Sequence, residues 1–221
     1  AALTGGEFDV CLLISTKSHE RLDSFLDVLF DKFDVFGDYQ IFPLVKLIHH
    51  PYNYLDSKND EFTHILQETT LATVDDLDMK ILHQIKQNAR LSYLQIGNTV
   101  GVSYQTVKNR IRILQKKGVV LGSKLFIHPQ QLNYESFVVM LSLSTFSKKD
   151  DLSFFQYILQ HKNITTVMKV IGGKWTYMLT VDCKDREQLH EIMIDVKNKY
   201  PVMDEFEILT VFNDVEMDHY P

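Results

Sequence analysis

Three segments between residues 74 and 118 repeat apolar residues at helical spacing. Each segment therefore predicts an amphipathic helix that buries one face. The apolar stripes are Leu77, Ile81, Leu82 and Ile85, then Tyr93, Ile96 and Val100, then Val107, Ile111 and Leu114. Residues that suit helix caps and exits flank the segments: Asp75 or Asp76, Ser92, Gly101, Ser103 and Gly118. A packing helix followed by two short helices around a tight glycine turn predicts a helix-turn-helix over residues 75–128.

A different pattern fills residues 129–221. Strand-like and helical runs follow one another in the order strand, helix, strand, strand, helix, strand. The runs are residues 136–145, 148–161, 164–173, 175–183, 185–200 and 205–217. This βαββαβ order predicts a ferredoxin-like sandwich, in which two helices cover one face of an antiparallel sheet. The expected fold class is therefore α+β.

The N-terminal segment repeats part of that pattern. Residues 3–44 align without a gap with residues 170–211. The matched pairs are Gly5–Gly172, Gly6–Gly173, Phe8–Trp175, Leu12–Leu179, Leu22–Leu189, Leu26–Met193, Phe33–Tyr200 and Ile41–Ile208. Residues 1–50 are therefore predicted to be the second half of another ferredoxin-like unit, and residues 51–74 a partly helical connector.

This half unit is expected to contain strands at residues 10–15 and 41–46 and a helix at residues 20–33. The helix would bury Phe25, Leu26 and Leu29. In a ferredoxin-like sheet these two strands are separated by another strand, and open strand edges invite pairing. We expect that strand to come from residues outside the chain or from another polypeptide. The chain begins at Ala1 inside an apparent strand pattern, which suggests a fragment or a processed product.

Composition excludes several classes of protein. The 221-residue chain is 45% hydrophobic and 24% charged, as ordinary globular proteins are. It contains no run of 18 apolar residues and no secretory signal, so no membrane partner is expected. Cys11 and Cys183 lie far apart without a metal-ligand spacing. We therefore expect no disulfide framework, metal or cofactor, and a location in the reducing cytoplasm.

The net charge of −6 is unevenly distributed along the chain. Residues 1–78 carry a net charge of −10 and residues 129–221 a net charge of −5. Residues 79–128 contain nine basic side chains and no Asp or Glu. A basic module between acidic flanks is typical of a protein that binds a polyanion, although a solvated basic face remains the alternative.

The third predicted helix explains why carboxylates are absent there. Its polar residues occupy an arc separate from its apolar stripe. Amide, hydroxyl and basic side chains of this kind read base edges in the major groove and neutralise phosphates, whereas a carboxylate would repel them. The predicted contacts with double-stranded DNA are Ser103, Tyr104, Gln105, Thr106, Lys108, Asn109, Arg112, Lys116, Lys117 and Lys124. Residues 119–129 favour either a small wing or a linker strand.

Residues 75–134 resemble the Lrp/AsnC family, also known as feast/famine regulators. The resemblance rests on Leu77 and Asp78, on the segment from Arg90 to Val100, and on a series that continues through the third helix. That series is Gly101, Val102, Ser103, Val107, Arg110, Leu114 and Lys116 to Val120. The resemblance implies a winged helix-turn-helix and a sequence-specific transcription regulator. It also implies that the C-terminal domain forms dimers or larger homo-oligomers and binds amino acids or related effectors at subunit contacts.

The family's effector site lies near a Gly-x-aromatic-Asp turn. The N-terminal copy retains this turn from Gly6 to Asp9, whereas the C-terminal copy has Thr176 in place of the aspartate. The resemblance therefore makes Gly6, Asp9, Gly172, Gly173 and Thr176 the candidate effector-binding residues. The glycines could equally serve only to shape a turn.

Two other functions remain open. One is an effector-sensing or assembly protein that does not bind DNA. The other is an enzyme similar to the sirohaem decarboxylases, which use related domains. Against an enzyme, the segment from Ile171 to Cys183 contains no His or Arg cluster, and the chain shows no phosphate-binding glycine loop, zinc spacing or nucleophile elbow.

Overall fold

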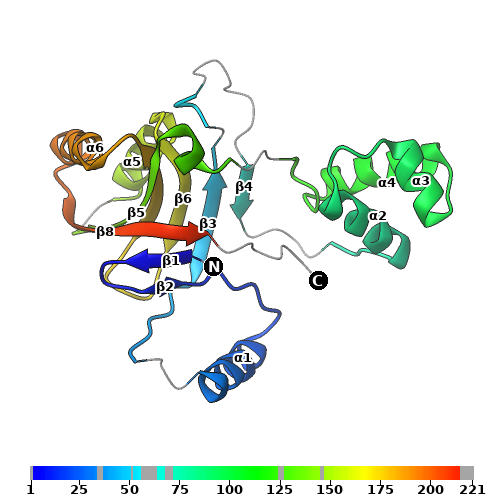
Figure 1. Cartoon of the computed structure of the whole chain (residues 1–221), viewed down its shortest axis with the longest axis horizontal. Coiled ribbons are helices and arrows are strands. Elements are labelled where there is room, and N and C mark those ends of the chain that lie inside the picture. Colours follow the sequence, from blue (N-terminus) through cyan, green and yellow to red (C-terminus); the bar gives the residue numbers. More distant parts are fainter. Residues whose placement is uncertain are drawn as a thin grey trace.

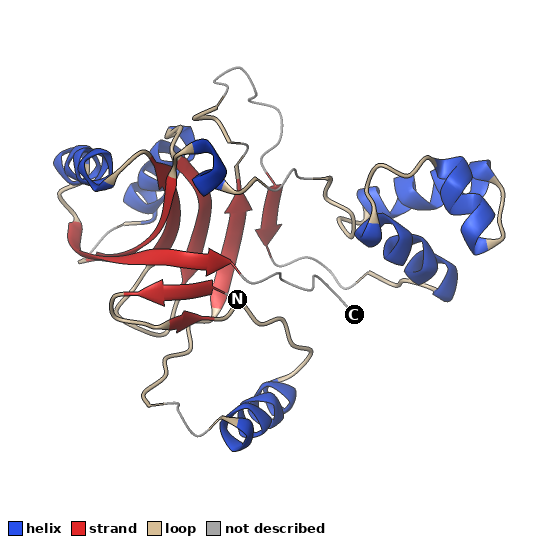
Figure 2. Ribbon diagram, viewed as in Figure 1, coloured by secondary structure: helices blue, strands red, loops and turns tan. Residues whose placement is uncertain are grey.

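A computed structural model describes residues 2–33, 37–50, 52–55, 64–67, 72–123, 127–144 and 147–214. The helices are α1 (His19–Lys32), α2 (Asp76–Gln87), α3 (Tyr93–Val100), α4 (Tyr104–Lys116), α5 (Lys148–Gln160) and α6 (Arg186–Lys199), with a 3-10 turn at Pro129–Leu132. The strands are β1 (Ala2–Gly5), β2 (Val10–Cys11), β3 (Leu44–His49), β4 (His64–Gln67), β5 (Glu135–Leu143), β6 (Ile164–Val170), β7 (Tyr177–Cys183) and β8 (Met203–Asp214). Figures 1 and 2 show α2, α3 and α4 set apart from the sheet that contains the strands.

The C-terminal unit has the predicted βαββαβ order. Its strands lie in the order β8-β5-β7-β6, and each neighbouring pair is antiparallel. Helices α5 and α6 cover the same face of the sheet (Figure 1). Phe137 and Leu179 of the sheet, Phe154 of α5 and Val196 of α6 are fully buried in one apolar core.

The N-terminal segment extends this same sheet at both of its edges. Strand β1 pairs antiparallel with β8, and β2 pairs with β1. At the opposite edge β3 pairs antiparallel with β6, and β4 pairs with β3. The result is an eight-stranded sheet in the order β2-β1-β8-β5-β7-β6-β3-β4.

This topology corrects the prediction for residues 1–50. The expected strands at 10–15 and 41–46 are observed at Val10–Cys11 and Leu44–His49, and they lie at opposite ends of one sheet. The strands between them are β1 of the same segment and the four strands of the C-terminal unit, so all come from the same chain and not from outside it. The physical reason is that β6 and β8 offer unpaired backbone edges to any strand on the same chain.

Helix α1 also differs from the prediction. It spans His19–Lys32, one residue earlier at each end than predicted, and Ser18 caps its start, but none of its residues is buried. Phe25, predicted to be buried, is 41% exposed, and Val28 is 65% exposed. Figure 1 shows α1 standing away from the sheet, and its Phe30 contacts the ring of Tyr39, with centroids 5.1 Å apart. The sheet therefore does not cover its apolar stripe.

The connector contains a strand where a partly helical segment was expected. Its described residues, 52–55, 64–67 and 72–74, include β4 and no helix. The side chain of Tyr52 accepts a hydrogen bond from the backbone N–H of Ile127, at 3.3 Å. This contact ties the start of the connector to the start of the C-terminal unit.

The face of the sheet opposite α5 and α6 carries a second apolar cluster. Met140, Val170, Trp175 and Leu209 form its buried centre. Residues of the N-terminal segment pack against it, namely Phe8, Cys11 and Phe42. The rings of Phe8 and Phe42 also contact each other edge to face, with centroids 6.2 Å apart. The N-terminal segment therefore covers this face as well as extending both edges.

Candidate nucleic-acid interface

Helix α4 is held by a small apolar core. Val107 and Ile111 of α4 are buried in one apolar cluster with Ile81 of α2 and Ile96 of α3, as the predicted stripes require. Leu114 of α4 is also fully buried. Side-chain caps begin all three helices: Asp75, Ser92 and Ser103 each accept a hydrogen bond from a backbone N–H three residues later. The core and caps together fix which face of α4 points outward.

The turn between α3 and α4 requires glycine at two positions. Gly101 ends α3 in the left-handed conformation, with φ 78°. A Cβ at Gly97 would lie 2.6 Å from the carbonyl oxygen of Val102, so the two helices approach too closely for a side chain. The tight turn therefore depends on both glycines, of which only Gly101 was predicted.

The outward face of α4 carries the predicted polar side chains. The exposed side chains are those of Gln105, Asn109, Arg112 and Lys116. The side-chain amide of Gln105 donates to the side-chain oxygen Oδ1 of Asn109 at 3.3 Å. Paired amides of this kind can instead donate to and accept from the edge of an adenine. Arg112 and Lys116 lie further along the same helix, where cationic side chains neutralise phosphates.

Tyr104 is supported by a ring that the sequence did not single out for this role. The rings of Tyr93 and Tyr104 lie 5.8 Å apart, and the Lys108 ammonium lies 6.0 Å from the centroid of the Tyr104 ring. Tyr104 remains 43% exposed. Aromatic contact fixes its orientation at the start of α4 and leaves the hydroxyl accessible to a ligand.

Ser103 and Thr106, also predicted to contact DNA, have a structural role in the free protein. The Ser103 hydroxyl accepts from the backbone N–H of Thr106 at 3.1 Å, and the two hydroxyl groups lie 2.8 Å apart. Both residues thus cap the first turn of α4. The helix dipole at this end of α4 favours an anion.

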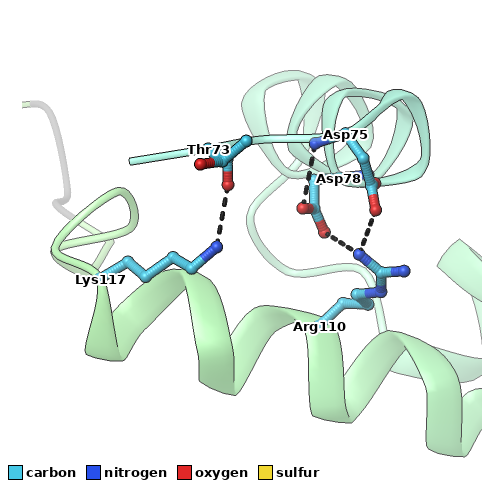
Figure 3. Close-up of polar contacts among 5 residues, drawn as sticks. All are labelled: Thr73, Asp75, Asp78, Arg110 and Lys117. Carbon is cyan, nitrogen blue, oxygen red and sulfur yellow. Dashed lines mark hydrogen bonds and ion pairs between the residues drawn. The ribbon is translucent and has the colours of Figure 1, made fainter. Parts of the chain in front are cut away.

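Arg110 clamps α4 to the start of α2. Its guanidinium donates to the carboxylates of Asp75 and Asp78, the latter at 3.3 Å (Figure 3). Asp78 is buried, and it also accepts from the backbone N–H of Asp75 at 3.3 Å. The sequence left Arg110 without a role in the DNA interface, and the structure makes it a positioning residue.

Lys117 makes a similar contact within the chain. Its ammonium donates to the backbone carbonyl of Thr73 at 2.9 Å (Figure 3). This ammonium was predicted to contact DNA, yet here it fastens the end of α4 to the residues before α2. Lys116, one position earlier, makes no comparable hydrogen bond or ion pair with the described residues.

Asp75 gives the clamp a dependence on pH. Its pKa lies below the ordinary value, first because the backbone N–H of Asp78 donates to the carboxylate at 2.9 Å, and second because Arg110 donates to it. A carboxylate with a lowered folded pKa stabilises the fold above its unfolded pKa, and that contribution is lost as the pH falls through the folded pKa. Acid should therefore loosen α2 from α4.

Replacing Arg110 by Gln should destabilise the helix-turn-helix, whereas replacing Arg112 by Gln should not. Arg110 holds two carboxylates, one of them buried, and removing it leaves Asp78 without a cationic partner. Arg112 is exposed on the polar face. Thermal unfolding of both variants at pH 7 tests this. Equal melting temperatures of the two variants would contradict the clamp. On acidification to about pH 3, Arg110→Gln should lose less stability than the wild type, because it no longer has the ion pair that acid removes.

The predicted wing is not formed in the described residues. Residues 119–123 follow α4 without strand structure. Lys124, the last predicted DNA contact, lies outside the residues that the structure describes. The backbone N–H groups of Val119 and Val120 both donate to the Leu114 carbonyl, so this segment first closes the end of α4.

The predicted effector residues do not form one site. Gly172 and Gly173 face the N-terminal segment: a Cβ at Gly173 would lie 2.9 Å from the Phe42 ring. Thr176 is engaged through its backbone N–H, which donates to the Leu141 carbonyl at 2.8 Å. Asp9 is exposed, and its carbonyl accepts from the N–H of Thr4 at 2.9 Å.

Gly6, one of this set, lines a pocket beside α6. The pocket has a volume of about 400 Å³, and Gly5, Gly6, Arg186, Leu189, His190, Ile208, Thr210 and Phe212 line it. The Arg186 guanidinium donates to the Thr210 hydroxyl at 3.1 Å, which holds it beside the pocket. No sequence pattern pointed to Arg186 and His190, since the pocket forms only where the glycine turn meets α6.

The described residues contain neither a metal-binding cluster nor a membrane-spanning helix. No group of three or more His, Cys, Asp or Glu side chains among them could hold a metal ion. No helix in this part of the chain has the length and apolar character needed to cross a bilayer.

Comparison with known proteins finds a matching domain model and related regulators. Residues 74–115 match the model of the AsnC-type helix-turn-helix domain. An uncharacterized HTH-type transcriptional regulator of Pyrococcus horikoshii is 28% identical over 131 residues, which cover 59% of this chain and 84% of the relative. The leucine-responsive regulatory protein of Haemophilus influenzae is 20% identical over 147 residues, which cover 66% of this chain and 89% of the relative.

Solved structures agree on the fold. A transcriptional regulator of Neisseria meningitidis, solved as a complex with L-Met, aligns with a TM-score of 0.59 at 17% identity, over 67% of this chain and 97% of that one. None of these matches reaches the full length of the chain. The chain thus carries an AsnC-type helix-turn-helix domain and is related, in sequence and in fold, to the Lrp/AsnC transcription regulators.

Proposed function

We propose that the protein is a transcription regulator that binds double-stranded DNA in a sequence-specific way through α4. The observation that carries this proposal is the exposed face of α4, where Gln105, Asn109, Arg112 and Lys116 point outward. Asp75 and Asp78, two carboxylates at the start of α2, are paired with Arg110. Amides supply base contacts and cations supply phosphate contacts, which are the two parts of specific binding.

Capture of genomic DNA fragments by the native protein tests this function. Wild-type protein should enrich a defined set of fragments, and a variant with Lys108, Arg112 and Lys116 replaced by Gln should enrich none. Each of these side chains lies outside the buried core, so the variant should fold normally, which circular dichroism can check. Failure of the wild type to retain any DNA at low salt would favour a sensing or assembly protein without DNA binding.

We further propose that the regulator acts as a homo-oligomer, at least a dimer. Two related helices can then meet half-sites about one helical turn of DNA, or a multiple of it, apart. The sequence-based expectation was a dimer built through the C-terminal sandwich. Since Phe8, Cys11 and Phe42 occupy one face of that sandwich, the contact between chains is expected on another of its surfaces. Sedimentation at micromolar concentration tests the proposal, and a monomer that still binds tightly to a single half-site would contradict it.

The effector is proposed to be an amino acid or another small carboxylate. The pocket of about 400 Å³ has room for such a molecule, and it presents the Arg186 guanidinium beside the turn at Gly5 and Gly6. A guanidinium pairs with a carboxylate through two parallel hydrogen bonds. Leu189 and Ile208 offer an apolar wall for a side chain. The similar Neisseria regulator was solved with L-Met, which supports the class of ligand without fixing its identity.

Arg186→Gln should abolish stabilisation by the effector. Amino acids are added singly to the wild type, and an active one should raise the melting temperature because it binds only the folded state. In Arg186→Gln the shift should disappear, while Lys197→Gln, a basic residue in the last turn of the same helix, should keep it. An equal shift in both variants would remove Arg186 from the site.

A further inference from the structure

The N-terminal segment and the C-terminal unit share one local structure. The sequence repeat has an offset of 167 residues, and this offset carries His19–Lys32, the bounds of α1, onto Arg186–Lys199, the bounds of α6. The N-caps Ser18 and Asp185 also correspond, and each accepts a hydrogen bond from the residue three positions later. Residues 3–47 are therefore folded locally as a partial copy of residues 170–214.

Strand pairing between the two copies is reciprocal. Under the offset β1 corresponds to the end of β6, and β3 corresponds to the end of β8. The pair β1–β8 at one edge thus corresponds to the pair β6–β3 at the other edge. Gly5 lies opposite Thr210, and their equivalents Gly172 and Pro43 are also neighbours, with a Cβ at Gly172 placed 3.3 Å from the Pro43 ring.

The glycine turns make the same reciprocal contact. A Cβ at Gly6 would lie 2.7 Å from the Leu209 side chain. A Cβ at Gly173, the equivalent of Gly6, would lie 2.9 Å from the ring of Phe42, the equivalent of Leu209. In each copy the glycine leaves the space that an apolar side chain of the other copy fills.

The apolar cluster on the sheet face opposite α5 and α6 contains both members of two equivalent pairs. Phe8 and Trp175 correspond under the offset, as do Phe42 and Leu209, and all of them belong to the same cluster. When residue i of one unit contacts residue j of the other, and j of the first contacts i of the second, the two units are related by a twofold axis. Simple capping of two free edges would not make the equivalent residues meet in this way.

We infer that residues 3–47 occupy, within the same chain, the position that a second subunit would hold against the C-terminal sheet. The chain then contains an internal pseudo-twofold interface, and the sheet face opposite α5 and α6 is not free to bind a second copy. The α6 residues Leu189, Ile192, Met193 and Val196 are buried, whereas α1 buries none of the equivalent side chains. The partial copy thus provides the interface with the C-terminal sheet. Among the described residues, no sheet covers its own helix, α1. None of this depends on DNA binding.

Two glycine substitutions test the reciprocity. Gly6→Val and Gly173→Val each place atoms where the other copy packs, so each should release β1 and β3 together, although the nearest contact of Gly173 is Phe42, beside β3 and not beside β1. Hydrogen exchange should rise by about tenfold or more at the amides of β6 and of β8 that face the N-terminal strands. Gly37→Val is the matched control, because a Cβ at Gly37 meets nothing within 4 Å. Circular dichroism and exchange in β5 and β7 show whether the C-terminal unit remains folded.

A cysteine pair tests whether the segment docks within its own chain. Leu47 and Met168 are paired across β3 and β6, and paired Cα atoms in antiparallel strands lie about 4.5–5.5 Å apart, within the range for a disulfide. The Leu47→Cys, Met168→Cys variant should oxidise to a cross-linked monomer on non-reducing electrophoresis. A cross-linked dimer, or no cross-link, would overturn the proposal. So would a Gly173→Val variant whose exchange rises only around its own turn, with β1 still protecting β8.

Discussion

Gln105→Ala should relax the choice of DNA sequence, whereas Lys116→Ala should weaken binding to every sequence alike. Gln105 is exposed in the first turn of α4, and its amide can donate and accept at one base edge. Losing a good contact of this kind costs about 1–3 kcal/mol of discrimination at one or two positions. Lys116 is exposed in the last turn, where an ammonium neutralises a phosphate without reading sequence.

Salt dependence separates these two roles. Binding of each variant to a specific and a random duplex is measured across a series of salt concentrations. Lys116→Ala should lower the slope of log K against log salt by about 1, because one fewer counterion is released. Gln105→Ala should leave that slope unchanged. If both variants behaved identically on specific and random DNA, the division of α4 into a reading part and an anchoring part would be wrong.

The helix-turn-helix was predictable because its signals are local. Caps at Asp75, Ser92 and Ser103 and a left-handed exit at Gly101 lie within a few residues of the turns that they shape. The βαββαβ order was predictable for a similar reason, since strand and helix periods differ and each element is long. What the periods could not show was Arg110, whose partners lie 35 and 32 positions away in sequence.

The N-terminal segment shows the opposite case. Its repeat with the C-terminal unit correctly predicted the position of α1, because caps and periodicity act locally. The sheet to which its strands belong depends on which edges are free in three dimensions, and no local pattern reports that. Leu47 and Ile48 became buried against β6 instead of in a separate half domain, and Phe25 stayed exposed.

The candidate effector pocket could not be predicted for the same reason: it depends on contacts between segments that are distant in sequence. Gly6 was proposed from the turn motif, and it does line the pocket. Arg186 and His190 lie on α6, in a stretch that reads only as an amphipathic helix. A pocket made where two distant segments meet is visible only once their pairing is known, here through Gly5 opposite Thr210.

Leu114→Ala should abolish DNA binding by unfolding the helix-turn-helix and not by removing a contact. Leu114 is fully buried at the end of α4, where its carbonyl also accepts from Val119 at 2.9 Å. Truncating a fully buried leucine costs about 2–5 kcal/mol, through lost burial and the cavity left behind. Since the core of this unit is small, that loss is a large part of the stability available to it.

Ile113→Ala provides the matched control on the neighbouring residue. Ile113 is 47% exposed, so the same truncation removes little buried surface and should cost well under about 1 kcal/mol. Unfolding is followed by hydrogen exchange in α2, α3 and α4, with β5 and β7 as the internal reference in the same molecule. Leu114→Ala should expose the amides of the three helices and leave the strands protected. If DNA binding were lost while those helices stayed protected, Leu114 would have to act at the DNA surface, and the assignment of the two faces of α4 would be reversed.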